Sequence, residues 1–380
     1  MDSVLRWAEG QHDALIVFLR QLVECESPSD DALAVGRCAD LFASQIGDFA
    51  KVRRVRGTGG FGPHLLCEFK LPGRGKDGQI LALGHSDTVY PIGTLASMPF
   101  RTVGGRLHGP GVFDMKGGLA MFVFAMRALR ELDIPVRRRV VLQVNSDEEM
   151  GSPTSRALTE EQARKSVAVI VAEPAAGTDG KAKTARKGVG GFRVAVHGKA
   201  AHSGLDFSSG ASAIVELARQ IEAIAGFTDL GKGLTVNPGV IGGGTRTNVV
   251  AAEAWCDVDV RVARARDWVM VERKFRALKP VDKRCVVEVS GELNRPPLER
   301  SKGGASLYKT AKTIAESLGF ELGETMAGGG SDGNFTAALD VPTLDGMGAV
   351  GDGAHSENEY ILADRIAGRV ALLARLVEAL

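Results

Sequence analysis

The chain has 380 residues, with 47 Lys and Arg against 46 Asp and Glu, so its formal net charge is only +1. This balance argues against a surface that binds nucleic acid or an anionic membrane as the main function, because both require an excess of basic residues. Hydrophobic residues make up 44% of the chain, which is enough for a sizeable core and, at this length, predicts two or three domains.

The sequence contains no apolar run near the ~20 residues of a membrane helix, and we expect no membrane segment. Its first 25 residues carry four carboxylates in an amphipathic pattern, which is unlike a signal peptide. The five cysteines form no CxxC pair and are expected to be reduced. These features predict a cytoplasmic protein.

In chain order, the N-terminal part alternates helices with apolar strands. We expect helices over residues 12–25, 31–46, 117–132 and 154–164. We expect strands over residues 64–70, 80–83, 139–145 and 167–172. Unbroken runs such as VVLQV and VAVIVA are typical of strands that are buried on both faces. Together these elements predict an α/β layered domain.

The pattern changes after Lys187. The strands expected there lie over residues 191–197, 234–241, 249–262 and 284–293, and the helices over 210–224 and 267–278. Their β-α-β-β-α-β order is the ferredoxin-like arrangement, and we predict a separate α+β domain over residues 188–297. It interrupts a layered domain formed by residues 1–187 and 298–380. The last helices of that domain are expected over residues 303–318, 332–338 and from 364 onward.

A histidine and an aspartate follow the apolar strand 80–83. His85 and Asp87 are two positions apart in extended chain and therefore point to the same side. One can bind a metal ion while the other supports it; the alternative is a loop histidine with satisfied hydrogen bonds. Ligands of open α/β sheets bind at the carboxyl ends of strands, which favours the metal site.

Further carboxylates follow at two points of the chain. Asp114 lies in a glycine-rich loop at the entrance to a predicted helix, where a helix cap is the alternative function. Glu148 and Glu149 belong to the run DEE after the strand 139–145. Such a run beside a core is unfavourable unless it is solvated or a cation neutralises it.

Glu173 and His355 complete the set of candidates. Glu173 follows the apolar run VAVIVA, and His355 lies in a glycine-rich loop near the C-terminus. We predict that all five segments lie at strand ends on one edge of the sheet. Two histidines and at least three carboxylates, with no cysteine, suit zinc and harder divalent ions. Two such ions about 3.5–4 Å apart can share a carboxylate and activate a water molecule, and a further carboxylate must then transfer the proton.

This succession of segments resembles the M20 family of co-catalytic zinc peptidases and deacylases, and within it the glutamate carboxypeptidase branch. The matching segments are HSD at 85–87, GPGVFDMKGG at 109–118, DEE at 147–149, EP at 173–174 and HS at 355–356. They follow the family's order over nearly the whole chain. The resemblance implies a zinc-peptidase-like α/β catalytic domain, with the ferredoxin-like domain inserted as a dimerisation or lid domain.

The resemblance also implies two zinc ions held by five ligands. Asp114 bridges both ions, His85 and Glu173 bind one ion, and Glu149 and His355 bind the other. A cis peptide bond after Asp114 is a further expectation from the family.

Two other carboxylates take different roles in this resemblance. Asp87 supports the ring of the ligand His85. Glu148 is the general base, which takes a proton from water and returns it to the leaving amine.

Segments of the inserted domain match those that contact the substrate in the family. GKAAHSG at 198–204 places His202 as the group that stabilises the oxyanion, in dimers often at the partner's active site. The segments GGGTRTN at 242–248 and DVDVR at 257–261 match as well. The substrate-binding candidates are Asn248, Arg261, Arg295, Gly330 and Ser331.

One lysine bears on specificity. Lys181, eight residues after Glu173, stands where the branch places a lysine that can meet the side-chain carboxylate of the substrate. A cation at this point makes C-terminal Glu or Asp the expected substrate. A solvated lysine among other basic residues is the alternative.

The expected reaction is therefore hydrolysis of the amide bond to a C-terminal amino acid, with glutamate preferred, in a small peptide or an N-acyl amino acid. Two zinc ions per subunit are expected, and Co²⁺ or Mn²⁺ also suits these ligands. The family implies a homodimer. An N-acyl-amino-acid deacylase would break the same bond with the same metals and is the main alternative.

Three weaker hypotheses follow, of which the nucleotide-binding one rests on a chance match. GGSDG at 329–333 fits G-x-S-x-G, which gives a serine hydrolase with Ser331, Asp352 and His355, although the preceding segment is too polar for a buried strand. GTGGFG at 57–62 fits a nucleotide-binding turn, but it leads into a strand instead of a helix. A non-catalytic protein that binds metal or peptide is the third hypothesis.

Overall fold

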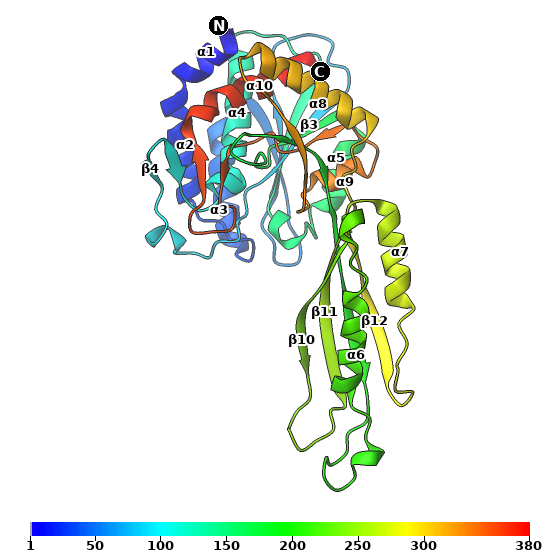
Figure 1. The fold of residues 1–380 in the computed structure, drawn as a ribbon. Helices are drawn as coiled ribbons and strands as arrows, with labels where there is room; N and C mark the ends of the chain where they lie inside the picture. Colours follow the sequence, from blue (N-terminus) through cyan, green and yellow to red (C-terminus); the bar gives the residue numbers. More distant parts are fainter. Residues whose placement is uncertain (1) are drawn as a thin grey trace. The chain divides into compact units, whose positions relative to one another are not determined.

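The computed structural model describes residues 2–380, which form two compact units. The first unit comprises residues 2–185, 300–327 and 331–380, and the second comprises residues 186–299 and 328–330. The second unit is drawn in green to yellow in Figure 1. Both units combine helices and sheets, so the predicted α/β fold class with an inserted α+β domain is confirmed. The domain expected over residues 188–297 falls within the second unit.

The first unit is built on a six-stranded main sheet with the strand order β1-β2-β6-β3-β7-β14. Its strands are β1 (Ala50–Val55), β2 (His64–Phe69), β3 (Gln79–His85), β6 (Arg139–Asn145), β7 (Ser166–Val171) and β14 (Thr343–Leu344). Strands β6, β3, β7 and β14 run parallel, whereas β1 and β2 are antiparallel at one edge. Because β3 lies between β6 and β7, the carboxyl ends of these three strands are neighbours.

The first unit also contains α-helices (Figure 1). They are α1 (Ser3–Gly10), α2 (His12–Glu24), α3 (Ala32–Ile46), α4 (Gly117–Glu131), α5 (Arg156–Arg164), α8 (Lys302–Ser317), α9 (Gly333–Ala337) and α10 (Ile366–Ala379). Sequence analysis missed α1, which begins where Asp2 accepts hydrogen bonds from the N–H groups of Val4 and Leu5.

The main sheet separates two hydrophobic cores, because alternate residues of a strand point to opposite faces. Ile80 and Ala82 of β3 belong to the larger core, with side chains of α2, α4 and α10. Leu81 and Leu83 belong to the smaller core, which includes Ala163 of α5. All of β3 is buried. This burial on both faces explains the unbroken apolar runs in the sequence.

A small sheet with the order β15-β16-β5-β4 was not predicted. Its strands are β4 (Arg101–Val103), β5 (Arg106–His108), β15 (Gly351–Asp352) and β16 (Tyr360–Leu362), and β8 (Ala182–Arg186) pairs with β13 (Glu324–Ala327) in a further two-stranded sheet. Strands of two or three residues are too short to show an alternating pattern. The small sheet nevertheless matters for the site, since it brings the segments after β5 and before β16 together.

The second unit has the β-α-β-β-α-β order that was predicted from the sequence. Its elements are β9 (Gly188–His197), α6 (Ala213–Ala225), β10 (Thr235–Gly243), β11 (Glu253–Val262), α7 (Ala265–Arg276) and β12 (Val286–Arg295). The antiparallel sheet has the order β10-β11-β9-β12. Buried residues alternate along β9 and β11, because only one face of the sheet is covered. On that face, Phe192 of β9 stacks on Phe275 of α7.

None of the helices within residues 2–380 has the length and apolarity that are needed to cross a lipid bilayer.

Candidate metal centre

Three segments of the site leave the carboxyl ends of neighbouring strands of the main sheet. His85 is the last residue of β3, Glu148 and Glu149 lie in a short turn after β6, and Glu173 lies two residues after the end of β7. Strands β6, β3 and β7 are adjacent, so the sheet order alone brings these segments together. The expected position at a strand-end edge is correct for this part of the site.

Asp114 and His355 arrive from the small sheet and not from the ends of main-sheet strands, which corrects the expectation of a single edge. Asp114 lies in the irregular segment Val112–Lys116 that connects β5 to α4. His355 lies in the loop between β15 and β16. Strand β16 pairs with β5, and this pairing brings the two segments together. The peptide bond between Asp114 and Met115 is cis, as the family resemblance implied.

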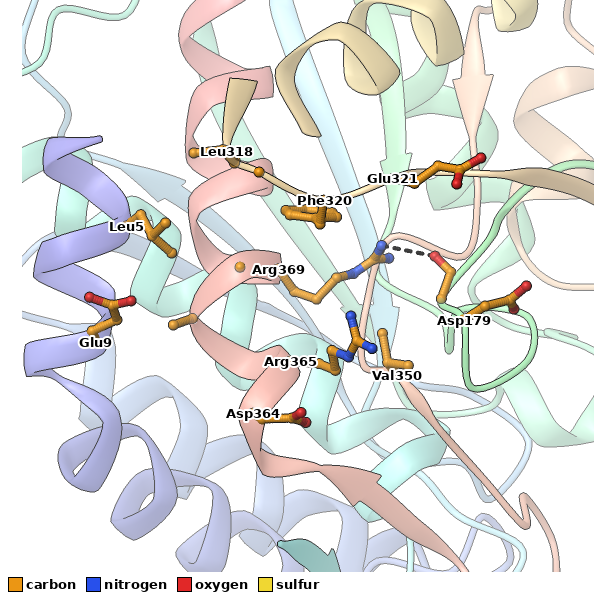
Figure 2. A pocket seen from close by; sticks show the side chains of 14 residues that line it. Leu5, Glu9, Asp179, Leu318, Phe320, Glu321, Val350, Asp364, Arg365 and Arg369 are labelled. Atoms are coloured by element: carbon orange, nitrogen blue, oxygen red, sulfur yellow. Dashed lines mark hydrogen bonds between the residues drawn. The ribbon is translucent and has the colours of Figure 1, made fainter. Parts of the chain in front are cut away.

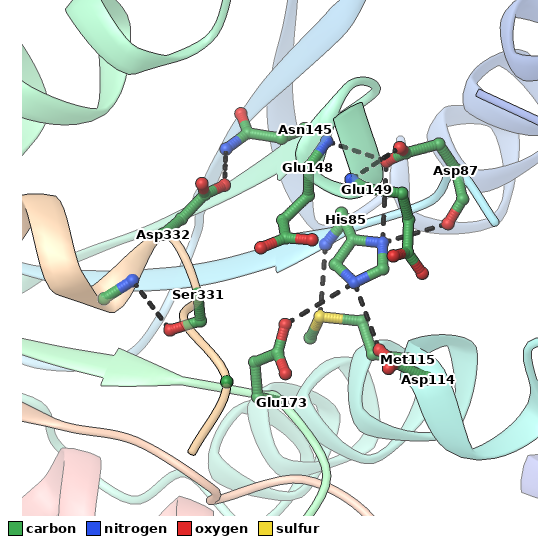
Figure 3. A network of polar contacts seen from close by, with 12 residues as sticks. His85, Asp87, Asp114, Met115, Asn145, Glu148, Glu149, Glu173, Ser331 and Asp332 are labelled. Carbon is green, nitrogen blue, oxygen red and sulfur yellow. Dashed lines mark hydrogen bonds and ion pairs between the residues drawn. The ribbon is translucent and has the colours of Figure 1, made fainter. Parts of the chain in front are cut away.

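The five predicted ligands form two groups that share Asp114. Nε2 of His85 lies 3.3 Å from Oδ1 of Asp114 and 3.5 Å from Oε1 of Glu173. Nε2 of His355 lies 3.5 Å from Oδ2 of Asp114 and 3.3 Å from Oε2 of Glu149. Each oxygen of Asp114 therefore faces a different histidine, which is the arrangement that a bridging carboxylate requires. Figure 3 shows Asp114 and Glu173 directed at the His85 ring.

The donor atoms of this centre fit divalent metal ions. Nε2 of His85, Oδ1 of Asp114 and Oε1 of Glu149 are buried and make no hydrogen bond. Buried polar atoms without a partner are unfavourable, and a cation would satisfy these three. Ligand atoms of His85, Asp114 and Glu149 also lie within 4.8 Å of one another, as do those of His85, Glu148 and Glu173.

The His85 ring is oriented by the main chain of Asp87. Its Nδ1 lies 2.9 Å from the carbonyl oxygen of Asp87 and 3.5 Å from the carboxylate. A carbonyl oxygen only accepts, so Nδ1 carries a proton, which leaves Nε2 as the ring nitrogen that would bind a metal ion. The Asp87 carboxylate instead accepts from the Ser29 hydroxyl and from the N–H groups of Glu148 and Glu149. Asp87 thus ties the DEE turn to the end of β3.

Glu148, which the resemblance predicts to be the general base, lies beside the centre. Its carboxylate is within 4.8 Å of donor atoms of both His85 and Glu173, and Figure 3 shows it next to the His85 ring. The neighbouring Asp147 points elsewhere, since its carboxylate accepts from the N–H groups of Thr154 and Ser155. The run DEE therefore divides into one structural and two site residues.

Contacts within the centre move the pKa values of its members. The carboxylates of Asp114 and Glu149 raise the pKa of His355 to about 10. Burial raises the pKa of Asp114, but the adjacent His355 and His85 rings outweigh burial and hold this pKa well below its usual range. Burial raises the pKa of Glu149. Metal ions compete with protons for the same lone pairs, so metal binding will release protons.

His202 and Asn248, two of the predicted substrate contacts, lie on exposed parts of the second unit. Nδ1 of His202 accepts hydrogen bonds from the N–H groups of Gly204 and Leu205. Its ring proton is therefore on Nε2, which leaves this atom as a donor.

The arginine candidates of the second unit differ in their burial. Arg261 is partly exposed and its Nε donates to Asp259. Arg295 is buried and its side chain packs against Gly330, where an added Cβ would lie 2.9 Å from Cδ of Arg295.

Lys181 lies before β8 in the first unit, with its side chain 45% exposed and its Nζ 2.7 Å from the Asp179 carboxylate. In this structure the lysine is paired within its own turn. A substrate carboxylate must therefore compete with Asp179 for the ammonium group.

Ser331 is fully buried, and its hydroxyl donates to Asp345. Its neighbour Asp332 accepts from Asn145 at the end of β6, as Figure 3 shows. His355 faces Asp114 and Glu149 instead of Ser331, so the structure contradicts the serine-hydrolase hypothesis. The glycine-rich segment at 57–62 joins β1 to β2, which is the wrong context for a dinucleotide-binding turn.

Sequence analysis missed one carboxylate that contacts the site. Glu359 is buried, and it accepts hydrogen bonds from the N–H groups of Gly111, Phe113 and Asp114. It lies four residues after His355 in a polar stretch, and nothing in the local sequence distinguishes it from a solvated glutamate.

A separate pocket of about 200 Å³ lies elsewhere in the first unit (Figure 2). Leu5 of α1, Phe320 and Arg369 of α10 are among its lining residues. The Arg369 guanidinium donates to the carbonyl oxygens of Gly180, Gly346 and Gly348, so it ties turns together. None of the predicted metal ligands lines this pocket.

An α/β domain that gathers two histidines and three carboxylates around shared donor atoms defines a metallohydrolase. The chain matches the model of Peptidase family M20/M25/M40 over residues 81–379. Carboxypeptidase G2 of Pseudomonas sp. (strain RS-16) is 30% identical over 383 residues, which cover 99% of this chain and 92% of that protein. The chain therefore belongs to peptidase family M20/M25/M40, as the resemblance indicated.

Solved structures share the fold. Aminopeptidase PepT from Bacillus cereus ATCC 10987 has a TM-score of 0.81 at 23% identity, covering 97% of this chain and 98% of that chain. The YXEP protein of Bacillus subtilis, described as a dinuclear metal binding peptidase from the M20 family, has a TM-score of 0.67 at 14% identity, with 98% of each chain covered.

Proposed function

We propose that the chain is a dizinc hydrolase that cleaves the amide bond to a C-terminal amino acid, preferably glutamate, with Glu148 as the general base. The observation that carries this proposal is the placement of Asp114, whose two carboxylate oxygens face His85 and His355 separately. Asp114 would bridge two ions, with His85 and Glu173 on one side and Glu149 and His355 on the other. Nitrogen and carboxylate donors without cysteine suit zinc, as well as Co²⁺ or Mn²⁺.

The proposed mechanism assigns the proton transfers to Glu148. Two bound zinc ions supply Lewis acidity, which lowers the pKa of a water molecule and polarises the scissile carbonyl. Glu148 accepts the proton of the attacking water and then donates it to the leaving amine. Nε2 of His202, which carries the ring proton, is the proposed donor to the oxyanion. We propose that Asn248, Arg261, Arg295 and the Gly330–Ser331 segment orient the substrate.

The proposed preference for glutamate rests on Lys181 and on the resemblance of the sequence motifs to the glutamate carboxypeptidase branch. The side chain of Lys181 is 45% exposed, and its ammonium group would exchange Asp179 for a carboxylate of the substrate. A charge-assisted hydrogen bond between these groups is stronger than a neutral one. We therefore propose that glutamate or aspartate at the C-terminal side is bound better than a neutral residue.

A product assay tests this preference. Peptide-linked and N-acylated forms of Glu, Asp, Phe and Ala are hydrolysed by the wild-type chain and by Lys181→Ala, and kcat/KM is compared. We expect glutamate to be preferred, and Lys181→Ala to lower kcat/KM for Glu about tenfold, the ratio that corresponds to about 1.4 kcal/mol, while the value for Ala stays unchanged. Preference for Phe or Ala would contradict the glutamate assignment.

The same assay separates the carboxypeptidase from the N-acyl-amino-acid deacylase, because both reactions use the same ligands and base. Cleavage of acetylated amino acids without cleavage of peptides would identify a deacylase. Loss of activity to a chelator, with recovery on addition of Zn²⁺, tests the metal requirement. We also propose a homodimer, which light scattering coupled to gel filtration tests.

A further inference from the structure

Glu359 lies at the junction of the two segments that the small sheet brings to the site. One oxygen of its carboxylate accepts hydrogen bonds from the N–H groups of Phe113 and Asp114, with N···O distances of 2.7 and 2.9 Å. The other oxygen accepts a hydrogen bond from the N–H group of Gly111 at 3.1 Å. These donors span the turn that carries the bridging ligand Asp114. A buried carboxylate held by three N–H groups fixes the path of that turn.

Tyr90 connects the same carboxylate to the loop of His355. Its hydroxyl is within hydrogen-bond distance of the Glu359 carboxylate and of the carbonyl oxygen of Ser356, the residue that follows His355. Tyr90 itself follows His85 by five residues. The contacts therefore join the Asp114 turn, the His355 loop and the segment after β3.

The His355 loop needs such a connection. The side chain of His355 is 51% exposed, so packing alone does not hold it. Its φ is +61°, in the left-handed region that a residue other than glycine seldom adopts without support from its surroundings. The contacts of Tyr90 and Glu359 provide that support on the C-terminal side of the histidine.

We propose that Glu359, together with Tyr90, is a positioning residue that holds Asp114 and His355 at the spacing needed by the second metal ion, the one shared with Glu149. This inference rests on the proposed two-ion function. The first ion depends less on Glu359, because His85 and Glu173 come from the ends of buried main-sheet strands.

The test is a titration of the metal-free full-length chain with Co²⁺, followed by absorption spectroscopy and by elemental analysis of bound metal. The variants are Glu359→Gln, which keeps the shape, Glu359→Asp, which keeps the charge but withdraws the carboxylate by one methylene, and Tyr90→Phe, which removes one hydroxyl. Glu216→Gln and Glu216→Asp are matched controls. Glu216 is a buried carboxylate of the second unit that accepts the N–H groups of Val281 and Asp282.

We expect the wild type to bind two ions. Both Glu359 variants should bind the second ion about 10–100-fold more weakly, the range found when groups that orient a metal ligand are removed. The first ion should be affected less, Tyr90→Phe should show a smaller loss in the same direction, and the Glu216 variants should titrate as the wild type does. Tyr90→Phe provides the test if the Glu359 variants do not fold.

Several outcomes would overturn the inference. Unchanged binding of both ions, or equal weakening of both, would make Glu359 a residue of the fold only. If Glu359→Asp binds the second ion with wild-type affinity, the charge of the carboxylate matters and not its position. A wild-type chain that binds a single Co²⁺ would contradict the proposed two-ion function itself, which is a different result from the others.

Discussion

The main sheet and the small sheet supply the metal centre in different ways. His85 continues a fully buried strand, and its side chain is 1% exposed. His355 lies in a loop between two strands of two or three residues, and half of its side chain is exposed. His85 and Glu173 are positioned by buried strands of the main sheet, whereas His355 depends on hydrogen bonds between loops. In a two-metal site of this fold, we therefore expect the ion bound by His85 to tolerate changes in surrounding residues better than the ion bound by His355.

The largest expected effect concerns the proton-transfer group at the end of main-sheet strand β6. Glu148→Gln should lower kcat by about 10²–10⁴-fold, which is the contribution of a general acid–base group, while both metal ions remain bound. Steady-state kinetics and metal analysis of the same sample check this. Because Glu148 also lies near donor atoms of His85 and Glu173, loss of an ion in the variant would make Glu148 a ligand.

Removing one histidine at a time addresses the comparison directly. His85→Ala and His355→Ala should each lower the affinity for a different ion. The loss should exceed the roughly 10–100-fold that follows from the removal of a group that orients a metal ligand. Only His85→Ala should also lower the free energy of unfolding of the metal-free chain, since His85 is buried and His355 is half exposed. Metal titration and urea unfolding measure the two effects. Equal destabilisation by both variants would remove the distinction between the halves.

Asp87 links two main-sheet segments and gives a smaller effect. The Asp87 carboxylate accepts hydrogen bonds from the Ser29 hydroxyl and from the N–H groups of Glu148 and Glu149. In Asp87→Asn the new NH₂ group cannot accept, and it must face at least one of these donors. We expect kcat/KM to fall about 10–100-fold, with the His85 orientation kept because its partner is the carbonyl oxygen of residue 87. An NMR measurement of the His85 Nδ1 proton, together with kinetics, tests this. A changed His85 environment would show that the carboxylate orients the ring.

The smallest effect is expected for Glu216 of the second unit, which lies in neither sheet of the first unit. It provides a reference for the effects of variants at the metal centre. Burial raises the pKa of Glu216, but the N–H groups of Asp282 and Val281 outweigh burial and lower it. A carboxyl whose pKa is lower in the folded chain than in the unfolded chain stabilises the fold at pH values above its unfolded-state pKa. This stabilisation is lost as the pH falls through its folded-state pKa. Glu216→Gln should lose about 1–3 kcal/mol at pH 7, and the difference from the wild type should shrink below about pH 4.3. Urea unfolding across pH measures it, and a pH-independent difference would contradict the assignment.

Much of the main-sheet half was accessible from sequence. Strand 139–145 was predicted with the bounds that β6 has, and the acids of DEE and EP follow strands as expected. Long apolar runs carry a strong signal, because burial on both faces leaves few polar residues. The strands of the small sheet carry no such signal, and the placement of Asp114 and His355 on this sheet was not foreseen.

By itself, the sequence determined the α/β class and the inserted β-α-β-β-α-β unit and predicted the residues that bind metal, because burial patterns and ligand chemistry are properties of local segments. Only the tertiary structure decided which oxygen of Asp114 faces which histidine, that the main chain of Asp87 orients His85, and that Glu359 connects the Asp114 turn to the His355 loop. The contacts of Asp114 and of Glu359 join residues more than 200 positions apart, such as Gly111 and Glu359 at 248 positions, and contacts over such separations depend on how strands pair and not on neighbouring residues.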